Sequence, residues 1–286
     1  MNNQSDKKFF WLHIKKCGGT SVKHFLGDLY NDIPNQSNIP SFIQVEKKYW
    51  NSILNNSRCN LGDYITKRVF FAKEFLFKDE WPDIFSFVFL RDPYDRCLSM
   101  FYYLMINNEM DYLKLIIKLF IKRKKIIITK SNLFDWFLEI LDIIHRKNQK
   151  EKLEFRYKTN HFIIHTNPYS NDLTDLKGNI LIKNLFKIEN FKEEIKKVFI
   201  KLKIDPNYNN LIKKINLKIS QEKETNNLNK MNTLIERKNY LEKHVSGEIN
   251  NFKLNSNNNK KLLLNSKQIK KIENIYFNDF EIYRSL

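Results

Sequence analysis

Two short segments of this chain combine residue types that bind anions. Residues 13–21 read H-I-K-K-C-G-G-T-S, and residues 91–99 read R-D-P-Y-D-R-C-L-S. The first segment holds lysines, a glycine pair and two hydroxyls, and the second holds two arginines and a serine. Ammonium groups, guanidinium groups and hydroxyls are donors for phosphate and sulfate oxygens. The sequence therefore predicts two anion sites, suited to a ligand with anionic groups at both ends.

The first segment (the first loop) follows an apolar run and resembles a phosphate-binding turn. Gly18 and Gly19 let the backbone approach a ligand closely. A helix beginning near Thr20 would add the positive end of its dipole, and Lys16 a mobile charge. The phosphate loop of nucleoside triphosphatases places its lysine after the last glycine, whereas Lys16 precedes Gly18. This order argues against ATP or GTP with magnesium. The alternative is an ordinary strand-to-helix turn with a solvated lysine.

The second segment (the second loop) also follows an apolar run. The Asp92-Pro93 pair predicts a turn, so Arg91 would emerge at the sheet edge. Ser99 lies two turns further along the helix that follows, where it and Arg91 are placed to share one phosphate. Arg96 either joins them or braces the loop. The alternative is an arginine paired with Asp92 or a neighbouring aspartate.

Strands followed by helices must position these loops. Apolar runs predict strands at residues 9–14, 69–72, 85–90 and within 179–187. Helical spacing predicts helices at residues 20–30, after residue 93, and at 112–146, 191–202 and 266–283. Residues 161–175 are polar and predict a loop. The sequence thus predicts an α/β fold with three α/β/α layers, a central parallel sheet, helix-rich insertions and a C-terminal helix, with ligands at the carboxyl ends of the strands.

The length of the chain indicates how many domains it forms, and its net charge indicates what kind of partner it binds. The 286 residues suit a single domain over 1–286, in which the Lys- and Asn-rich residues 205–262 form a variable part of helical pieces joined by loops. Lysine and arginine outnumber acidic residues by 50 to 32, a formal charge of +18. This charge favours an anionic partner. The alternative is a compositional bias spread along solvated helix faces.

Together the two loops resemble sulfotransferases that use 3′-phosphoadenosine 5′-phosphosulfate (PAPS), most closely the carbohydrate, heparan- and chondroitin-type branch. That family reads H-I-P-K-T-G-G-T-S in its first loop and L-R-D-P-x-x-R-x-x-S-x-Y in its second. Residues 186–191 and 275–281 are similar to its R-F-E-N-L element and its C-terminal Y-x-x-D-F-E helix. The resemblance implies a P-loop-like fold, PAPS as co-substrate without a metal, and sulfuryl transfer to a carbohydrate or glycolipid hydroxyl.

The resemblance also implies roles for single residues. The first loop would hold the 5′-phosphosulfate, and the second would hold the 3′-phosphate. The residues carried over by position for the 5′ end are Lys16, Cys17, Gly18, Gly19, Thr20 and Ser21. Arg91 and Ser99 are carried over for the 3′ end. Lys16 would also stabilise the charge that grows on the leaving oxygen. Cys17 replaces the usual threonine, as a small filler or as a reactive thiol near a helix N-terminus.

The sequence leaves the general base open. Related enzymes carry a histidine or a glutamate just after the second strand, and here the chain reads A-K-E without the histidine. Glu74 is the first choice, with Lys73 helping at the sulfate, because this pair is similar to that of the glucosaminyl sulfotransferases. The alternative is a surface ion pair. His165, in an H-x-x-P segment, is the second candidate. His161 fits less well, and His13 fits a packed core histidine better than a catalyst.

Two other functions remain open. A nucleotide-dependent phosphotransferase would need magnesium ligands and the other loop order. A basic protein that binds glycan or nucleic acid would keep only a degenerate nucleotide site. We expect a carbohydrate or glycolipid acceptor and no specific nucleic acid. The basic surface would suit an anionic saccharide. The basic residues 112–128 fit either peripheral membrane contact or a core helix with outward lysines.

Cysteine usage and the N-terminus bear on the compartment. The three cysteines, Cys17, Cys59 and Cys97, do not suggest a disulfide framework or zinc-ligand spacing. The sequence shows no signal peptide and no uncharged stretch of about 18 residues. We therefore expect a cytoplasmic protein.

Overall fold

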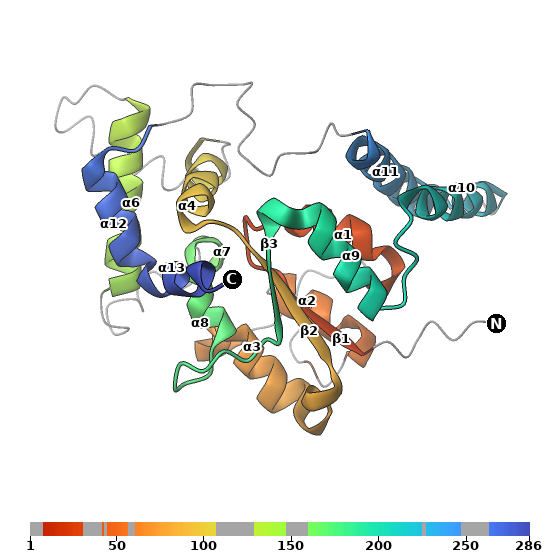
Figure 1. The fold of residues 1–286 in the computed structure, drawn as a ribbon, viewed down its shortest axis with the longest axis horizontal. Helices are drawn as coiled ribbons and strands as arrows, with labels where there is room; N and C mark the ends of the chain where they lie inside the picture. The colour runs from red at the N-terminus through yellow and green to blue at the C-terminus, as the bar shows by residue number, and fades with distance from the viewer. Residues whose placement is uncertain are drawn as a thin grey trace.

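Three parallel strands in the order β1-β2-β3 form the sheet (Figure 1). The strands are β1 Phe9–Leu12, β2 Phe85–Leu90 and β3 Asn184–Lys187. Leu12 lies opposite Val88, and Leu90 lies opposite Lys187. All three strands therefore end at the same edge of the sheet. The computed structural model describes residues 8–30, 42, 45–56, 61–106, 129–146, 160–224, 227–246 and 263–286.

Helices make up most of the described chain. The α-helices are α1 Gly19–Leu26, α2 Trp50–Asn56, α3 Arg68–Phe71, α4 Pro93–Phe101, α6 Lys130–Arg146, α7 Asn160–Thr166, α8 Tyr169–Leu173, α9 Phe191–Lys201, α10 Tyr208–Glu224, α11 Leu228–Val245, α12 Ser266–Ile275 and α13 Phe277–Arg284. Short 3₁₀ segments are η1 Gly27–Leu29, η3 Lys47–Tyr49, η4 Gly62–Thr66, η6 Lys78–Asp83 and η9 Ile188–Asn190. Two π-helical segments are η5 Ala72–Phe77 and η7 Tyr102–Ile106. Among the described residues, no helix is long and apolar enough to cross a membrane.

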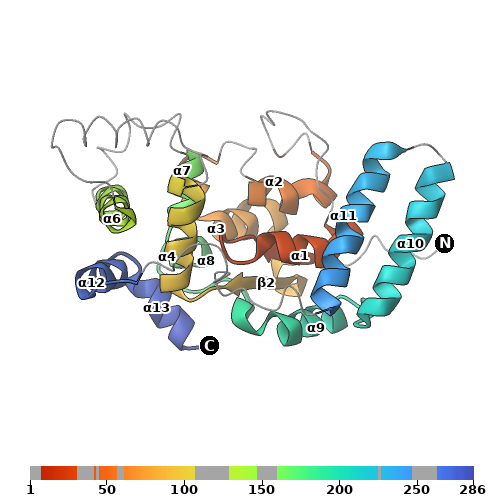
Figure 2. The ribbon, with the colours of Figure 1, turned by 90° about the horizontal axis from the view of Figure 1, so that it is seen from above.

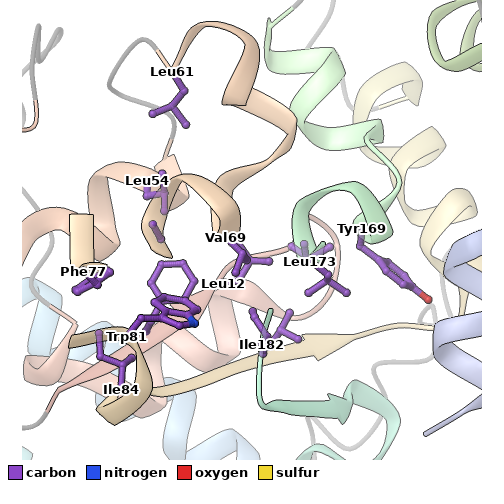
Figure 3. Packing of buried hydrophobic residues seen from close by; sticks show 14 of the residues in the cluster. Leu12, Leu54, Leu61, Val69, Phe77, Trp81, Ile84, Tyr169, Leu173 and Ile182 are labelled. Atoms are coloured by element: carbon purple, nitrogen blue, oxygen red, sulfur yellow. The ribbon is translucent and has the colours of Figure 1, made fainter. Parts of the chain in front are cut away.

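The sheet is covered on both faces, which explains why β1 and β2 are almost wholly apolar. On one face, Leu12 and Val88 pack against residues of α2, α3 and α8. Figure 3 shows Val69, Phe77 and Leu173 in this layer. On the other face, Trp11 and the neighbouring strand residues pack against α1, α9 and the α10–α11 helix pair (Figure 2). The predicted three-layer α/β architecture with a parallel sheet is confirmed.

A further helical cluster lies beyond the sheet edge where the strands end (Figure 1). Its core combines α4 with α6, α7, α12 and α13, and includes Phe101, Phe134 and Tyr276. The predicted C-terminal helix is present, but it is divided at Tyr276 into α12 and α13. Of the predicted helix over 112–146, residues 130–146 form α6, and residues 112–128 lie outside the described part together with the predicted membrane contact.

The predicted strand over 69–72 is wrong. This stretch forms α3 and continues into η5. Short apolar runs fit a buried helix as well as a buried strand, and the pattern alone cannot separate the two. Here Val69, Ala72 and Phe77 pack onto the sheet from outside it. Burial against an existing sheet therefore overrides the strand propensity of the phenylalanines.

The predicted loop over 161–175 is also wrong in most of its length, because α7 and α8 occupy it. Helix α8 depends on a residue from the far end of the chain. The buried Asp279 carboxylate accepts hydrogen bonds from the backbone N–H groups of Tyr169 and Ser170, at 2.9 Å each. Such a cap stabilises the start of a helix, and its source lies about a hundred residues away.

The remaining predictions differ mainly in their limits. The helices over 20–30 and 191–202 and the strand over 85–90 are confirmed, with α1 followed by η1. The strand over 9–14 ends at Leu12, and the late strand begins at Asn184. Within residues 205–262, α10 and α11 are long helices that lie side by side (Figure 2).

A buried ion pair joins α3 to α8. The Arg68 side chain donates to both carboxylate oxygens of Asp172, with Nε 2.9 Å from Oδ1 and Nη2 2.8 Å from Oδ2. Both side chains are almost completely buried. Removal of one partner from such a pair leaves an uncompensated buried charge.

We predict that Asp172→Asn lowers the free energy of unfolding by about 3–5 kcal/mol, because Arg68 then keeps its charge without a counter-ion. Urea denaturation followed by circular dichroism measures this loss. The control is Glu74→Gln, which breaks the exposed Lys73–Glu74 pair and is expected to cost less than about 1 kcal/mol. An equally small loss for both variants would contradict the account.

Candidate active site

The two predicted anion loops lie side by side. They follow the adjacent parallel strands β1 and β2 at the same edge of the sheet. Two contacts join them directly. Arg96 Nε donates to the Lys15 carbonyl at 3.2 Å, and the Arg91 backbone N–H donates to the Cys17 sulfur. The adjacency expected from the sequence is therefore present.

The backbone of the first loop turns through two left-handed residues. Lys16 has φ 65° and Gly18 has φ 74°. This conformation costs a residue with a side chain about 1–2 kcal/mol, so Lys16 is held there by its surroundings. Gly18 directly precedes α1 and has no side chain with which to cap it. The first N–H groups of α1 therefore face the loop without a side-chain cap, as at helix N-termini that bind anions.

Two buried arginines hold the carbonyls of this loop. Arg68 Nη1 donates to the His13 carbonyl at 3.1 Å, and Arg96 Nε donates to the Lys15 carbonyl. Both guanidinium groups are almost wholly buried. Their bonds fix two carbonyl oxygens towards the protein interior. The sequence did not single out Arg68, because it directly precedes residues 69–72, which were expected to form a strand.

The sequence left two roles open for Arg96, phosphate binding and bracing of the loop. Its hydrogen bonds in the structure brace the first loop. Its Nη2 donates to the carbonyls of Asn167 at 2.8 Å and His165 at 3.4 Å, and Nη1 lies 3.4 Å from Asp279 Oδ2. Burial raises the pKa of Asp279 to about 6, while the Arg96 charge and the backbone N–H groups oppose that shift. Arg96 thus ties the first loop to the C-terminal end of α7 and to α13.

Lys16 and His165, both predicted as catalytic, meet at one aromatic ring. Lys16 Nζ lies 4.0 Å from the centre of the Tyr103 ring. The His165 ring stacks on the same tyrosine, with 5.0 Å between ring centres and an interplanar angle of 18°. Tyr103 comes from η7, directly after α4. The sequence analysis gave Tyr103 no role, because nothing in its position along the chain reveals this contact.

His13 is a packed residue, as the sequence favoured. Its ring stacks on Trp11 with 5.1 Å between ring centres. A Cβ atom at Gly19 would lie 1.7 Å from His13 Nε2, so the first loop needs glycine at this position. Burial, with help from the nearby Lys15 and Arg68 charges, holds the pKa of His13 well below its usual value.

Lys15 contacts α2, whereas Lys16 contacts Tyr103. The Lys15 Nζ donates to the Asn55 carbonyl near the end of α2, at 3.0 Å. Burial, followed by the charge of Arg68, lowers the pKa of Lys15 to about 7. The residue that replaces the family's proline thus links the loop to α2.

The other first-loop residues differ in exposure. The Cys17 side chain lies in the core against the sheet. Thr20 is exposed at the start of α1. The Ser21 hydroxyl is hydrogen-bonded to the Tyr240 hydroxyl of α11. Thr20 therefore offers the accessible hydroxyl, whereas Ser21 is engaged by a helix that the sequence did not connect with this loop.

The second loop places Arg91 directly after β2 and Ser99 on α4, both largely buried. Asp92 caps α4, because its carboxylate accepts from the N–H groups of Tyr94 at 2.9 Å and Asp95 at 3.1 Å. Asp92 thus stabilises the N-terminus of α4, the helix that follows Arg91.

The Lys73–Glu74 pair is exposed, with Nζ 2.8 Å from Oε1. It lies on η5, within the helical stretch that begins at Arg68 beside the first loop. That stretch ends at Phe77, which packs on Phe10 near the start of β1, with 5.9 Å between ring centres. The pair therefore lies on the flank of the sheet rather than at a strand end.

The side chain of His161 is outside the described part. In the described ranges, no cluster of three or more His, Cys, Asp or Glu side chains could hold a metal ion.

Comparison with known proteins identifies the family. A model described as the sulfotransferase family matches residues 1–284, essentially the whole chain. No curated protein and no solved structure matches. The match confirms the resemblance on which the sequence prediction rested.

We predict that Cys17 resists alkylation in the native protein. Burial raises the pKa of its thiol to about 11, so only about one thiol in a thousand is ionised at pH 8. Iodoacetamide treatment at pH 8 followed by mass spectrometry should modify Cys17 only after unfolding in urea. Rapid modification of the folded protein would instead identify a reactive thiol.

Proposed function

The chain belongs to the sulfotransferase family, and we propose that it transfers a sulfuryl group from PAPS to a hydroxyl of a carbohydrate or glycolipid. One observation supports this most strongly. The loops after β1 and β2 lie together at one sheet edge, where Lys16 and His165 contact the same tyrosine ring. Cations and a candidate base are thus near each other beside an uncapped helix start.

We assign the 5′-phosphosulfate to the first loop. The N–H groups at the start of α1, the exposed Thr20 hydroxyl and Lys16 would donate to it. Gly18 and Gly19 would permit its close approach, with Cys17 and Ser21 supporting the loop from behind. We assign the 3′-phosphate to Arg91 and Ser99, which follow the neighbouring strand.

In this reaction the acceptor oxygen attacks sulfur in line. The new oxygen–sulfur bond forms as the bond from sulfur to the 5′-phosphate oxygen breaks. The products are a sulfate ester and 3′,5′-adenosine bisphosphate. Lys16 would neutralise the negative charge on the leaving oxygen. Its contact with Tyr103 is worth about 0.5–1 kcal/mol at an exposed site, so a charge-assisted bond to the ligand readily replaces it.

We propose His165 as the base that takes the acceptor proton. Its ring stacks on the tyrosine that also contacts Lys16, which brings it near the proposed phosphosulfate. The sequence ranked Glu74 first. Its carboxylate is instead paired with Lys73 on an exposed helical flank, so we place it second.

We predict that Lys16→Ala lowers the turnover number about 100- to 1,000-fold, because the leaving oxygen loses its cation. Transfer from ³⁵S-labelled PAPS to a panel of glycan and glycolipid acceptors measures this. Lys23→Ala is the matched control and should remain active, because Lys23 is an exposed lysine on α1, the helix that follows the first loop. Full activity of Lys16→Ala would defeat the assignment.

We predict that His165→Gln lowers turnover about 100-fold or more, because general base catalysis is lost. Affinity for 3′,5′-adenosine bisphosphate should stay within about twofold, since the histidine acts on the acceptor. Glu74→Gln is expected to keep its turnover. If Glu74→Gln loses turnover and His165→Gln does not, the glutamate is the base.

A further inference from the structure

A groove lies between the C-terminal part of α1 and the helices α10 and α11. Its volume is about 370 Å³, within the range of small-molecule sites. It is lined by residues of α1, η1, α10 and α11 and of the link between α9 and α10. None of them belongs to the two loops of the proposed active site.

The floor of this groove is apolar. Phe25 and Leu26 come from α1, and Leu211 and Ile215 come from α10. Leu217, one of the lining residues, is 66% exposed. An exposed leucine beside an apolar floor extends the surface that a hydrocarbon chain can cover.

The polar lining is strongly cationic. Lys203, Lys214, Lys218 and Arg237 face one carboxylate, Asp205, which gives a formal charge of +3. Lys214 and Lys218 stand four residues apart on α10. Like charges at this spacing destabilise a helix slightly, so their placement gives α10 no stability.

The backbone conformation of Lys203 also supports a binding role for the groove. It follows α9 with φ 52°, and Ile204 N donates to the Phe199 carbonyl at 2.8 Å. Glycine is the usual residue at this helix-ending position, because a side chain there costs about 1–2 kcal/mol. Here this strained position is occupied by Lys203, which lines the groove, instead of by a glycine.

We propose that this groove binds a single-chain amphipathic anion. The hydrocarbon tail would lie on the apolar floor, and the carboxylate, phosphate or sulfate headgroup would lie among the lysines. The floor disfavours nucleic acid, which would bury no comparable apolar surface there. The groove is separate from the proposed donor loops, since its first lining residue on α1, Phe25, follows Gly19 by six residues, or about 9 Å along that helix.

Calorimetry with dodecanoate below its micelle concentration tests the proposal. We expect micromolar binding to the full chain and at least tenfold weaker binding of dodecyltrimethylammonium, which has the same tail and the opposite charge. Leu217→Glu should weaken dodecanoate binding at least tenfold by placing a carboxylate in the groove. Leu228→Glu is the matched control, because Leu228 is 65% exposed and lies outside the groove.

A second pair of variants tests the cations without touching the floor. The double substitution Lys214→Gln/Lys218→Gln should weaken dodecanoate binding at least tenfold, and Lys213→Gln/Lys223→Gln should not. Equal binding of the two amphiphiles, or equal loss in both members of either matched pair, would overturn the proposal. So would sedimentation with phosphatidylglycerol vesicles without binding of dodecanoate, which would indicate a membrane-contact surface. These readouts do not depend on sulfuryl transfer.

Discussion

The structure depends on two buried guanidinium groups that hold the backbone of the first loop. Arg68 binds the His13 carbonyl, and Arg96 binds the Lys15 carbonyl. A buried cation is tolerated only when it is paired, and here the carboxylates come from α8 and α13. The N-terminal loop therefore cannot take its shape until segments from the second half of the chain have packed against it. Through Arg96, Asp279 of the C-terminal Y-x-x-D-F-E stretch thus has a structural role at the distant first loop.

The His13 and Lys15 carbonyls are held towards the protein interior, and this affects which charges face the sheet edge. The N–H groups at the start of α1 and the Lys16 side chain belong to the loop at the sheet edge, where Arg91 follows the adjacent strand. Donors held in place by the fold stabilise growing negative charge without reorganising, which is the main requirement for transferring an anionic group. The strained backbone of Lys16 and the close packing of His13 on Gly19 belong to the same arrangement. In the proposed reaction, loop shape, ligand charge and leaving-group stabilisation would thus follow from one set of buried contacts.

The parts of this arrangement that were predictable from sequence are local. Continuous apolar runs located β1 and β2, and the residue types after them located both loops at one edge. The helical stretch from Arg68 to Phe77 was not predictable, because its apolar run fits a strand equally well until the sheet it covers is known. Helix α8 was missed because its cap comes from Asp279. Lys16 and His165 were found separately, but their common contact with Tyr103, and that of Ser21 with Tyr240, arise only from tertiary packing.

The central claim is that one ligand bridges the two loops through an anionic group at each end. Calorimetry with 3′,5′-adenosine bisphosphate and with the 3′- and 5′-monophosphates tests it most directly. The account predicts that the native protein prefers the bisphosphate to each monophosphate at least tenfold. Lys16→Ala should lose its preference over the 3′-monophosphate, and Arg91→Ala its preference over the 5′-monophosphate. Equal binding of all three nucleotides by the native protein, or loss of the same preference in both variants, would contradict it.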